Sequence, residues 1–212
     1  MRDLIQLEFR PITTDDIAAM AALLLDRQRL ECQTYPYLNN SCLQTEYIID
    51  RLQRLFANVR VVGIGAFSKR HLVGYLIGSI RIDTRNGRFV AIPYEGVAVR
   101  ADVSVELIRY LYAQTAGLWL EHGCFCHSGI VPIGHHTYFD AFLRLSFGIE
   151  QVYAVLSLDD YEPFDNLPEA SVRLATLDDK AVMGEMSGII SRHQNGAPAF
   201  IPTYPEVLTS IR

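Results

Sequence analysis

Apolar and polar residues alternate along the chain, in some stretches with the period of a strand and in others with that of a helix. Strand-like spacing covers residues 4–12, 59–67, 72–82, 89–99, 124–133 and 151–158. Helical spacing covers residues 13–30, 43–56, 104–121 and 137–147. The predicted order is therefore β-α-α-β-β-β-α-β-α-β. Three consecutive strands followed by two helical crossovers predict an α/β fold, with helices on both faces of a mixed central β-sheet.

Local signals mark where the first helix begins and where the chain first turns back. Thr13 or Thr14 is a typical N-cap, and two aspartates follow at the positive end of the helix dipole. Asn86 and Gly87 favour a tight hairpin between the second and third of the consecutive strands, because both residue types tolerate a positive φ.

A short motif near the N-terminus recurs in the C-terminal part. The sequence RLATLDDKAVM, residues 173–183, matches RPITTDDIAAM, residues 10–20, at six of eleven positions, where average composition gives about one. Residues 159–170, DDYEPFDNLPEA, are acidic and contain two prolines, which is typical of a linker. We therefore expect one domain over residues 1–158, a linker after it, and a partial second copy, a strand plus helices, over residues 171–212.

The C-terminal segment is too small to close a hydrophobic core alone. Its apolar residues, among them Val172, Leu174 and Val182, must therefore cover another surface. That surface belongs either to the first domain or to a second chain, and we expect a homodimer through this segment.

Composition excludes several classes of protein. The chain has 212 residues, 50% of them apolar, and a net charge of −5, which gives no electrostatic footprint for nucleic acid. No apolar run approaches the roughly 20 residues of a membrane span, and the N-terminus lacks the apolar core of a signal peptide. Cys32, Cys42, Cys124 and Cys126 are too scattered for a disulfide framework or a zinc site. We expect a cytoplasmic protein with reduced thiols, no metal and no membrane partner.

Three segments are similar to the GNAT superfamily of acetyl-CoA-dependent N-acetyltransferases. FRPITTDD (9–16) resembles the family's opening strand and first helix. GVAVRAD (96–102), leading to WLEHGC (119–124), resembles its cofactor strand, pyrophosphate loop and long helix. HHTYFDAFLRLSFG (135–148) resembles its closing helix. The resemblance covers about residues 4–158 and implies a GNAT fold of the tandem type, with a truncated second copy.

The resemblance places acetyl-CoA, the acyl-donor substrate, along one strand and the turn after it. It implies binding by Val97, Ala98 and Val99 of the strand, by the window Ser104, Val105, Glu106, Leu107, Ile108 and Arg109 of the turn, and by His135 near the pantetheine arm. The family's turn carries glycines that let phosphate approach backbone amides, and Leu107 and Arg109 stand in their places. The pyrophosphate loop is therefore degenerate, and the amides and dipole of the helix start remain to attract phosphate.

Glu95 is the candidate catalytic base. It is the only carboxylate in FVAIPYEGVAV, residues 89–99. The resemblance implies that such a carboxylate accepts a proton from the attacking amine. A structural role, at a bulge or beside an arginine, is equally open. Phe142 takes the place of the tyrosine that serves the family as an acid, and Tyr138, one turn earlier, could replace it only in a rotated helix.

Two functional hypotheses follow from these residues. In the first, the protein is an acetyl-CoA-dependent N-acetyltransferase that acts on an unidentified small-molecule or peptide amine. In the second, it is a catalytically inactive GNAT-fold module that binds a ligand or a protein partner. The complete scaffold favours the enzyme, whereas the lost glycines and tyrosine favour the module, so binding of acetyl-CoA separates the two.

Overall fold

The computed structural model describes residues 7–38, 40–58, 60–83, 86–134, 136–154, 158–160, 171–189 and 193. Its strands are β1 (Glu8–Pro11), β2 (Val61–Ser68), β3 (His71–Asp83), β4 (Gly87–Ile92), β5 (Val97–Val99) and β6 (Cys126–Gly129). Its helices are α1 (Ile17–Thr34), α2 (Thr45–Asn58), α3 (Leu107–Glu121), α4 (His136–Arg144) and α5 (Lys180–Met186). Within these described residues, no helix has the length and apolarity that a membrane crossing requires. The chain divides into two units, Met1–Ile149 and Glu150–Arg212.

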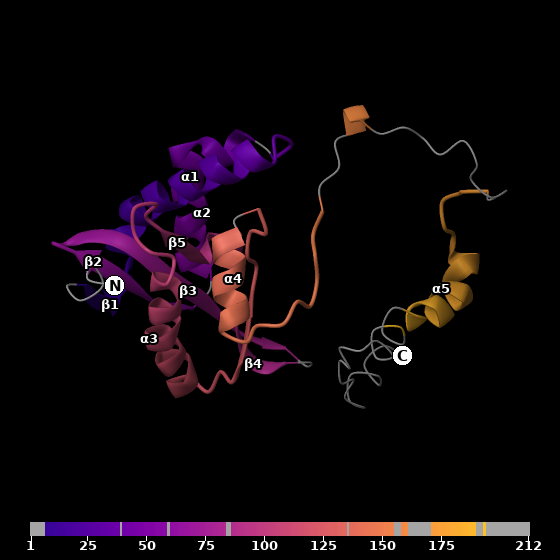
Figure 1. The fold of residues 1–212 in the computed structure, drawn as a ribbon. Coiled ribbons are helices and arrows are strands. Elements are labelled where there is room, and N and C mark those ends of the chain that lie inside the picture. Colours follow the sequence, from indigo (N-terminus) through magenta and orange to yellow (C-terminus); the bar gives the residue numbers. More distant parts are fainter. Residues whose placement is uncertain are drawn as a thin grey trace. The chain divides into compact units, whose positions relative to one another are not determined.

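The strands of the first unit form one six-stranded sheet (Figure 1). Its order is β1-β2-β3-β4-β6, and β5 pairs with β3 beside this path. All neighbours run antiparallel except β6, which runs parallel to β4. One edge of β3 pairs with β2, and the other is long enough for two partners, since Gly74–Leu76 pair with β5 and Ser79–Asp83 pair with β4. This mixed sheet, flanked by helices, confirms the predicted α/β fold class.

Helices cover both faces of the sheet. α1 and α2 lie on one face, and α3 and α4 lie on the other (Figure 1). Each face has its own core: Met20, Leu24, Ile48, Leu52, Tyr75 and Ile77 on the first, and Leu76, Leu107, Leu111, Trp119 and Phe142 on the second. β3 contributes Tyr75 and Ile77 to the first core and Leu76 to the second, because successive residues of a strand point to opposite faces.

The strand expected over residues 89–99 is in fact two strands, β4 and β5, separated by a 3-10 turn at Tyr94–Gly96. Pro93 ends the β4 ladder because it has no N–H to donate. The turn closes with a hydrogen bond of 2.7 Å from the Gly96 N–H to the Pro93 carbonyl. A Cβ at Gly96 would lie only 2.7 Å from the carbonyl oxygen of Ile77, so this position requires glycine. After the turn, β5 pairs with β3 again, further along, at Gly74–Leu76.

The strand expected over residues 151–158 does not form in its first half. Residues 151–154 have no regular secondary structure. Val152 and Tyr153 are 62% and 70% exposed, and no strand among the described residues pairs with residues 151–154 to stabilise an extended conformation. Residues 155–157 of this expected strand lie outside the described part of the chain.

The second unit repeats the local structure that opens the first. Before α1, the Asp16 carboxylate accepts two hydrogen bonds from Arg10, at 2.7 and 2.9 Å, and one of 3.0 Å from the Thr13 N–H. The same three bonds, at 2.7, 2.8 and 2.8 Å, recur before α5. The residues that make them are Arg173, Thr176 and Asp179. The matched sequence positions therefore form the same capped helix start twice.

Candidate functional site

One edge of β5 carries no strand within the described part of the chain. β6 pairs with β4 and does not continue along β5. The N–H of Arg100 donates to β3 at 2.9 Å, so Ala98, two residues earlier, also faces β3. The backbone groups of Val97 and Val99 therefore point the other way, to an open sheet edge.

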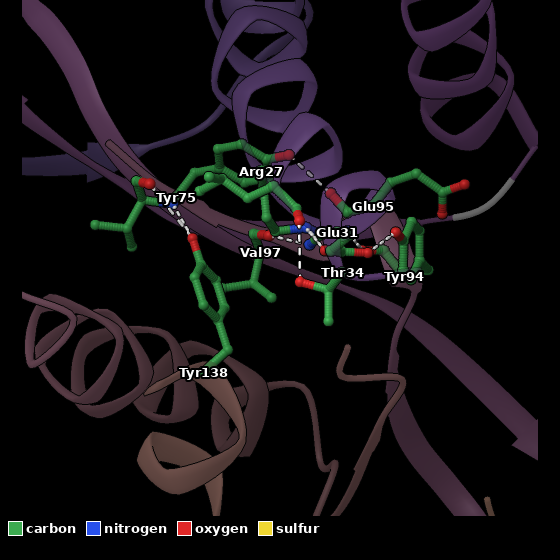
Figure 2. A network of polar contacts seen from close by, with 10 residues as sticks. Arg27, Glu31, Thr34, Tyr75, Tyr94, Glu95, Val97 and Tyr138 are labelled. Carbon is green, nitrogen blue, oxygen red and sulfur yellow. Dashed lines mark hydrogen bonds and ion pairs between the residues drawn. The ribbon is translucent and has the colours of Figure 1, made fainter. Parts of the chain in front are cut away.

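The hydroxyl of Tyr138, from α4, lies at this open edge (Figure 2). It accepts a hydrogen bond of 2.7 Å from the Val99 N–H and donates one of 3.3 Å to the Val99 carbonyl. Tyr138 is 4% exposed, and burial raises the pKa of its hydroxyl, which stays neutral and can both donate and accept. One side chain thus makes both bonds that a neighbouring strand or a bound ligand would make with Val99.

Arg27, from α1, covers the same edge two residues earlier. Its guanidinium donates to the carbonyl of Val97 and, at 2.8 Å, to the carbonyl of Tyr94. Its Nε lies 2.9 Å from one oxygen of the Glu31 carboxylate, and the Tyr94 hydroxyl donates to the other oxygen (Figure 2). Burial lowers the pKa of Arg27, but Glu31 and the nearby tyrosines raise it by more, so the guanidinium keeps its charge. We call Arg27, Glu31 and Tyr94 the buried ion-pair cluster; it holds α1 to the turn before β5.

Glu95, the candidate base, lies in the 3-10 turn between β4 and β5. It is 8% exposed, and its carbonyl accepts a hydrogen bond of 2.8 Å from the Tyr75 hydroxyl. Its carboxylate accepts a hydrogen bond from Arg51 Nε and forms an ion pair with the same guanidinium. The Arg51 side chain, from α2, is 50% exposed, so this pair lies at the protein surface. A base at this position would accept its proton beside a fixed positive charge.

The turn between β5 and α3 is closed by its own backbone. Four of its N–H groups donate within the turn: Glu106 to the Ser104 hydroxyl (3.3 Å), Leu107 to the Ser104 carbonyl (2.9 Å), Ile108 to the Val105 carbonyl (2.9 Å) and Arg109 to the Glu106 carbonyl (3.0 Å). The N–H groups at a helix start otherwise have no intrahelical partner and can bind an anion. A phosphate at this turn would therefore compete with hydrogen bonds that the turn already makes.

No protein-family model and no curated protein matches the sequence. Solved structures do match it. A ribosomal-protein-alanine N-acetyltransferase from Brucella melitensis biovar Abortus is 15% identical, with a TM-score of 0.53, and the match covers 72% of this chain and 99% of that chain. A GCN5-related N-acetyltransferase from Ralstonia eutropha is 12% identical, with a TM-score of 0.54 and coverage of 71% and 98%. The chain has the GNAT fold.

A third solved structure with this fold contains the acyl donor. It is a predicted acetyltransferase with acetyl-CoA from Clostridium acetobutylicum, 12% identical to this chain with a TM-score of 0.51. The match covers 74% of this chain and 99% of that chain. At such identities the likeness is one of fold.

Leu107, which stands where the GNAT resemblance implies a glycine, is a core residue. Leu107 and its neighbour Ile108 have no exposed surface. A Cβ at Gly74 of β3 would lie 2.9 Å from Leu107 Cδ2, so the two positions are packed against each other. The leucine therefore fills the core beneath β3. The strand residues of the candidate site, Val97, Ala98 and Val99, are buried as well.

The charged side chains of the turn pair with one another at the surface. Arg109 lies 2.8 Å from Glu106, and both side chains are about two-fifths exposed, at 43% and 41%. Arg100 lies 2.5 Å from Asp102, and its hydrogen bond lowers the pKa of that carboxyl. Each of these two arginines already has a carboxylate partner that a phosphate would have to replace.

α4 presents a tyrosine to the strand edge one turn earlier than the GNAT resemblance implies. Phe142, in the place of the family's tyrosine, is 3% exposed and packs against Phe147 with ring centroids 5.2 Å apart. Tyr138 of this helix bonds the backbone of β5. His135, expected near the pantetheine arm, lies outside the described residues.

Sequence reasoning missed the buried ion-pair cluster, although α1 carries a signal for it. One buried face of α1 carries, at helical spacing, Met20, Leu24, Arg27 and Glu31. The first two residues of this face are apolar and the last two are charged. Opposite charges spaced i, i+4 on a buried face predict a buried ion pair. The third member, Tyr94, carries no such signal, because the pattern around it predicts a strand.

Proposed function

We propose that the protein is an N-acetyltransferase that transfers the acetyl group of acetyl-CoA to an amine of a small molecule or a peptide. The observation that supports this most is the open edge of β5, preceded by a turn that carries a carboxylate, on a fold shared with acetyltransferases. Backbone groups at a strand edge can pair with the amide and thioester groups of an acyl-CoA arm.

The proposed reaction uses two groups of this chain. An edge N–H of β5 donates to the thioester oxygen and stabilises the negative charge that develops as the amine nitrogen attacks the carbonyl carbon. Glu95 accepts a proton from the attacking nitrogen. The carbon–sulfur bond then breaks, and the sulfur leaves as a thiol after it takes up a proton. In total, an acetyl group moves from sulfur to nitrogen and a proton moves from nitrogen to sulfur.

The turn before α3 is the proposed site for the pyrophosphate, as a degenerate form of the GNAT loop. The dipole of α3 still favours negative charge at its N-terminus. The amides of the turn are already hydrogen-bonded and its arginines are already paired, so fewer groups are free to bind a pyrophosphate. We therefore expect weaker binding of acetyl-CoA than a glycine-bearing loop would give.

A second candidate function is a catalytically inactive GNAT-fold module that binds a ligand or a protein partner. It is favoured by the side chains that already occupy the candidate site. Tyr138 and Arg27 bond the edge groups of β5, and Arg51 bonds the carboxylate of Glu95. An inactive module would keep such contacts permanently, because no substrate has to displace them.

Variants of Glu95 and Arg51 separate the two functions. Calorimetry measures acetyl-CoA binding, and release of free thiol measures acetyl transfer to a panel of amines. Glu95→Gln is expected to keep acetyl-CoA binding and to lower kcat/KM by at least about 100-fold, the range of a general base. Arg51→Met is the matched control, because it breaks the same ion pair and leaves the carboxylate in place.

The pattern across the two variants decides the role of Glu95. A base is indicated when Arg51→Met retains acetyl transfer and Glu95→Gln loses it. A purely structural role is indicated when both variants lose stability and activity alike. Absence of acetyl-CoA binding to the wild type at millimolar concentration would favour the inactive module.

We also propose that residues 171–189 begin a second copy of the GNAT fold. The repeated sequence and the equal hydrogen bonds before α1 and α5 support this. Met20 of the first copy is fully buried, whereas the equivalent Met183 is 56% exposed. A second copy would explain why an exposed position keeps an apolar residue.

A further inference from the structure

We propose that Tyr138 controls access of acyl-CoA to the β5 edge, because its hydroxyl occupies the hydrogen-bonding groups of Val99 until the ligand displaces it. This inference rests on the proposed function, since it concerns the same strand edge. It goes further by naming the side chain whose contacts must break before the arm of the ligand can bind.

Tyr138 and the ligand need the same two backbone atoms. Val99 offers one donor and one acceptor to the open edge, and the Tyr138 hydroxyl uses both, at 2.7 and 3.3 Å. Each amide of a pantetheine arm carries one carbonyl and one N–H, which are the complementary groups. The hydroxyl and an arm amide therefore compete for Val99 and cannot both be bonded to it.

Of the two side chains at this edge, Tyr138 is the one that can leave. Arg27 is bonded to two carbonyls and paired with Glu31, and its departure would leave that carboxylate buried without a charge partner. Tyr138 is neutral and lies in the first turn of α4, a helix of nine residues. Helix ends open more readily than core elements.

The contact also has a role in the ligand-free protein. An unpaired N–H in the interior destabilises a fold, and Val99 is a buried residue. The Tyr138 hydroxyl satisfies this N–H when no ligand is bound. Binding of an acyl-CoA arm therefore exchanges one hydrogen-bonded state for another, and this exchange weakens the affinity of the wild type.

Calorimetry with two probes, pantetheine and CoA, tests the proposal on the full chain. Tyr138→Phe keeps the ring and removes the hydroxyl, so we expect pantetheine to bind about tenfold more tightly, or about 1.4 kcal/mol. Tyr138→Ala also removes the ring and is expected to bind at least as tightly. Tyr112→Phe is the matched control, because its half-buried hydroxyl lies 2.9 Å from His127, and it should not change the affinity.

Two measurements by nuclear magnetic resonance support the calorimetry. Exchange of the Val99 amide is expected to be at least about tenfold faster in Tyr138→Phe, while exchange of the Ala98 amide, which faces β3, stays unchanged. The ring signals of Tyr138 in the wild type are expected to shift on saturation with CoA. This second measurement needs no variant, so it holds even if a substitution impairs folding.

The outcomes separate this inference from the proposed function. Equal pantetheine affinity of the wild type and Tyr138→Phe, with CoA binding intact, overturns the inference and leaves the proposed function standing. Tyr138 ring signals that stay in place when CoA saturates the wild type have the same meaning. If no protein, Tyr138→Ala included, binds pantetheine or CoA at millimolar concentration, the proposed function is wrong and the inference is wrong with it.

Discussion

The two halves of the candidate acyl-CoA site, the β5 edge and the turn before α3, are closed in different ways. At the β5 edge the closing side chains come from distant parts of the chain: Arg27 is 70 residues from Val97, and Tyr138 is 39 residues from Val99. At the turn, the side-chain contacts join residues only two or three positions apart. The tertiary fold therefore determines which side chains cover the β5 edge, whereas contacts between residues close in sequence cover the turn.

This difference determines how much free energy is needed to break the contacts in each half. Removing one partner of a buried charge pair leaves the other without solvation, whereas an exposed pair contributes only about 0–1 kcal/mol. A ligand at the turn competes with exposed ion pairs and with the turn's own backbone hydrogen bonds, whereas a ligand at β5 competes with hydrogen bonds from buried side chains. We expect the strand half to control whether acyl-CoA binds, and the turn half to adjust how tightly.

Arg27→Met gives the largest expected effect, because it removes the charge that stabilises Glu31 in the interior. The free energy of unfolding is expected to fall by about 3–5 kcal/mol, the range for breaking one side of a buried pair. Urea unfolding followed by circular dichroism measures the change. Arg29→Met is the control on the same helix: it breaks the exposed pair with Asp26 and should cost less than about 1 kcal/mol.

A double variant shows whether charge or packing carries this effect. Arg27→Met combined with Glu31→Leu removes both charges and is expected to regain most of the lost stability. The Arg27 guanidinium also lies over the Tyr94 ring, 4.4 Å from its centroid. A double variant as unstable as Arg27→Met alone would contradict the ion-pair explanation and point to this packing or to the hydrogen bonds that Arg27 donates to the carbonyls of Val97 and Tyr94.

Most elements of the fold could be predicted because their signals are local. The hairpin at Asn86 and Gly87 forms, with Gly87 at a φ of 63°, and Thr13 closes the expected capped turn. The apolar pattern continues on both sides of Pro93 and hides the break there, although the proline is itself a local signal for the end of a strand. The strand predicted at residues 151–154 is absent for another reason. A strand needs a partner edge, and the alternation of side chains does not show whether one is present.

The resemblance names Val97–Val99 as the strand residues of the candidate site, and among the described residues no strand pairs with their outer edge. The side chains that cover this edge could not be predicted. Helical spacing shows that Arg27 lies on the buried face of α1, and it does not show which backbone carbonyl the guanidinium meets. The same limit applies to Tyr138, whose contact with Val99 depends on how α4 packs on the sheet.

Alkaline pH is expected to destabilise the folded protein, by a smaller amount for each buried tyrosine than Arg27→Met does. Burial raises the pKa of Tyr75, Tyr94 and Tyr138, so these hydroxyls stay protonated in the folded protein above the ordinary tyrosine value of about 10. The unfolded chain loses the same protons near that pH and is favoured as the pH rises. Their contribution to stability is fully present below about pH 10 and falls above it, by about 1.4 kcal/mol per pH unit for each hydroxyl.

Urea midpoints between about pH 8 and about pH 11 measure this loss. Tyr138→Phe should show a shallower dependence on pH than the wild type, because one raised pKa is removed. Tyr110→Phe is the control, since Tyr110 is 51% exposed and should leave the slope unchanged. Equal slopes for the wild type and Tyr138→Phe would argue against a neutral, buried hydroxyl at the β5 edge.

Glu106→Gln, in the turn half, gives the smallest expected effect. It removes a negative charge from the proposed pyrophosphate site and releases Arg109 from its pair at 2.8 Å. CoA is expected to bind about two- to fourfold more tightly at low salt, and the gain should vanish at about 0.5 M salt, because both groups are exposed and screened. Pantetheine carries no phosphate, so its affinity should not change.

Comparing CoA with pantetheine makes Glu106→Gln a test of whether the turn and the β5 edge bind different parts of the ligand. Tyr138→Phe should improve binding of both pantetheine and CoA, whereas Glu106→Gln should improve binding of CoA alone. Glu121→Gln, at the opposite end of α3, is the control for a general loss of negative charge and should leave both affinities unchanged. If Glu106→Gln changed pantetheine binding, or if its gain for CoA persisted at high salt, the turn would act on the pantetheine arm and the assignment of pyrophosphate to it would be wrong.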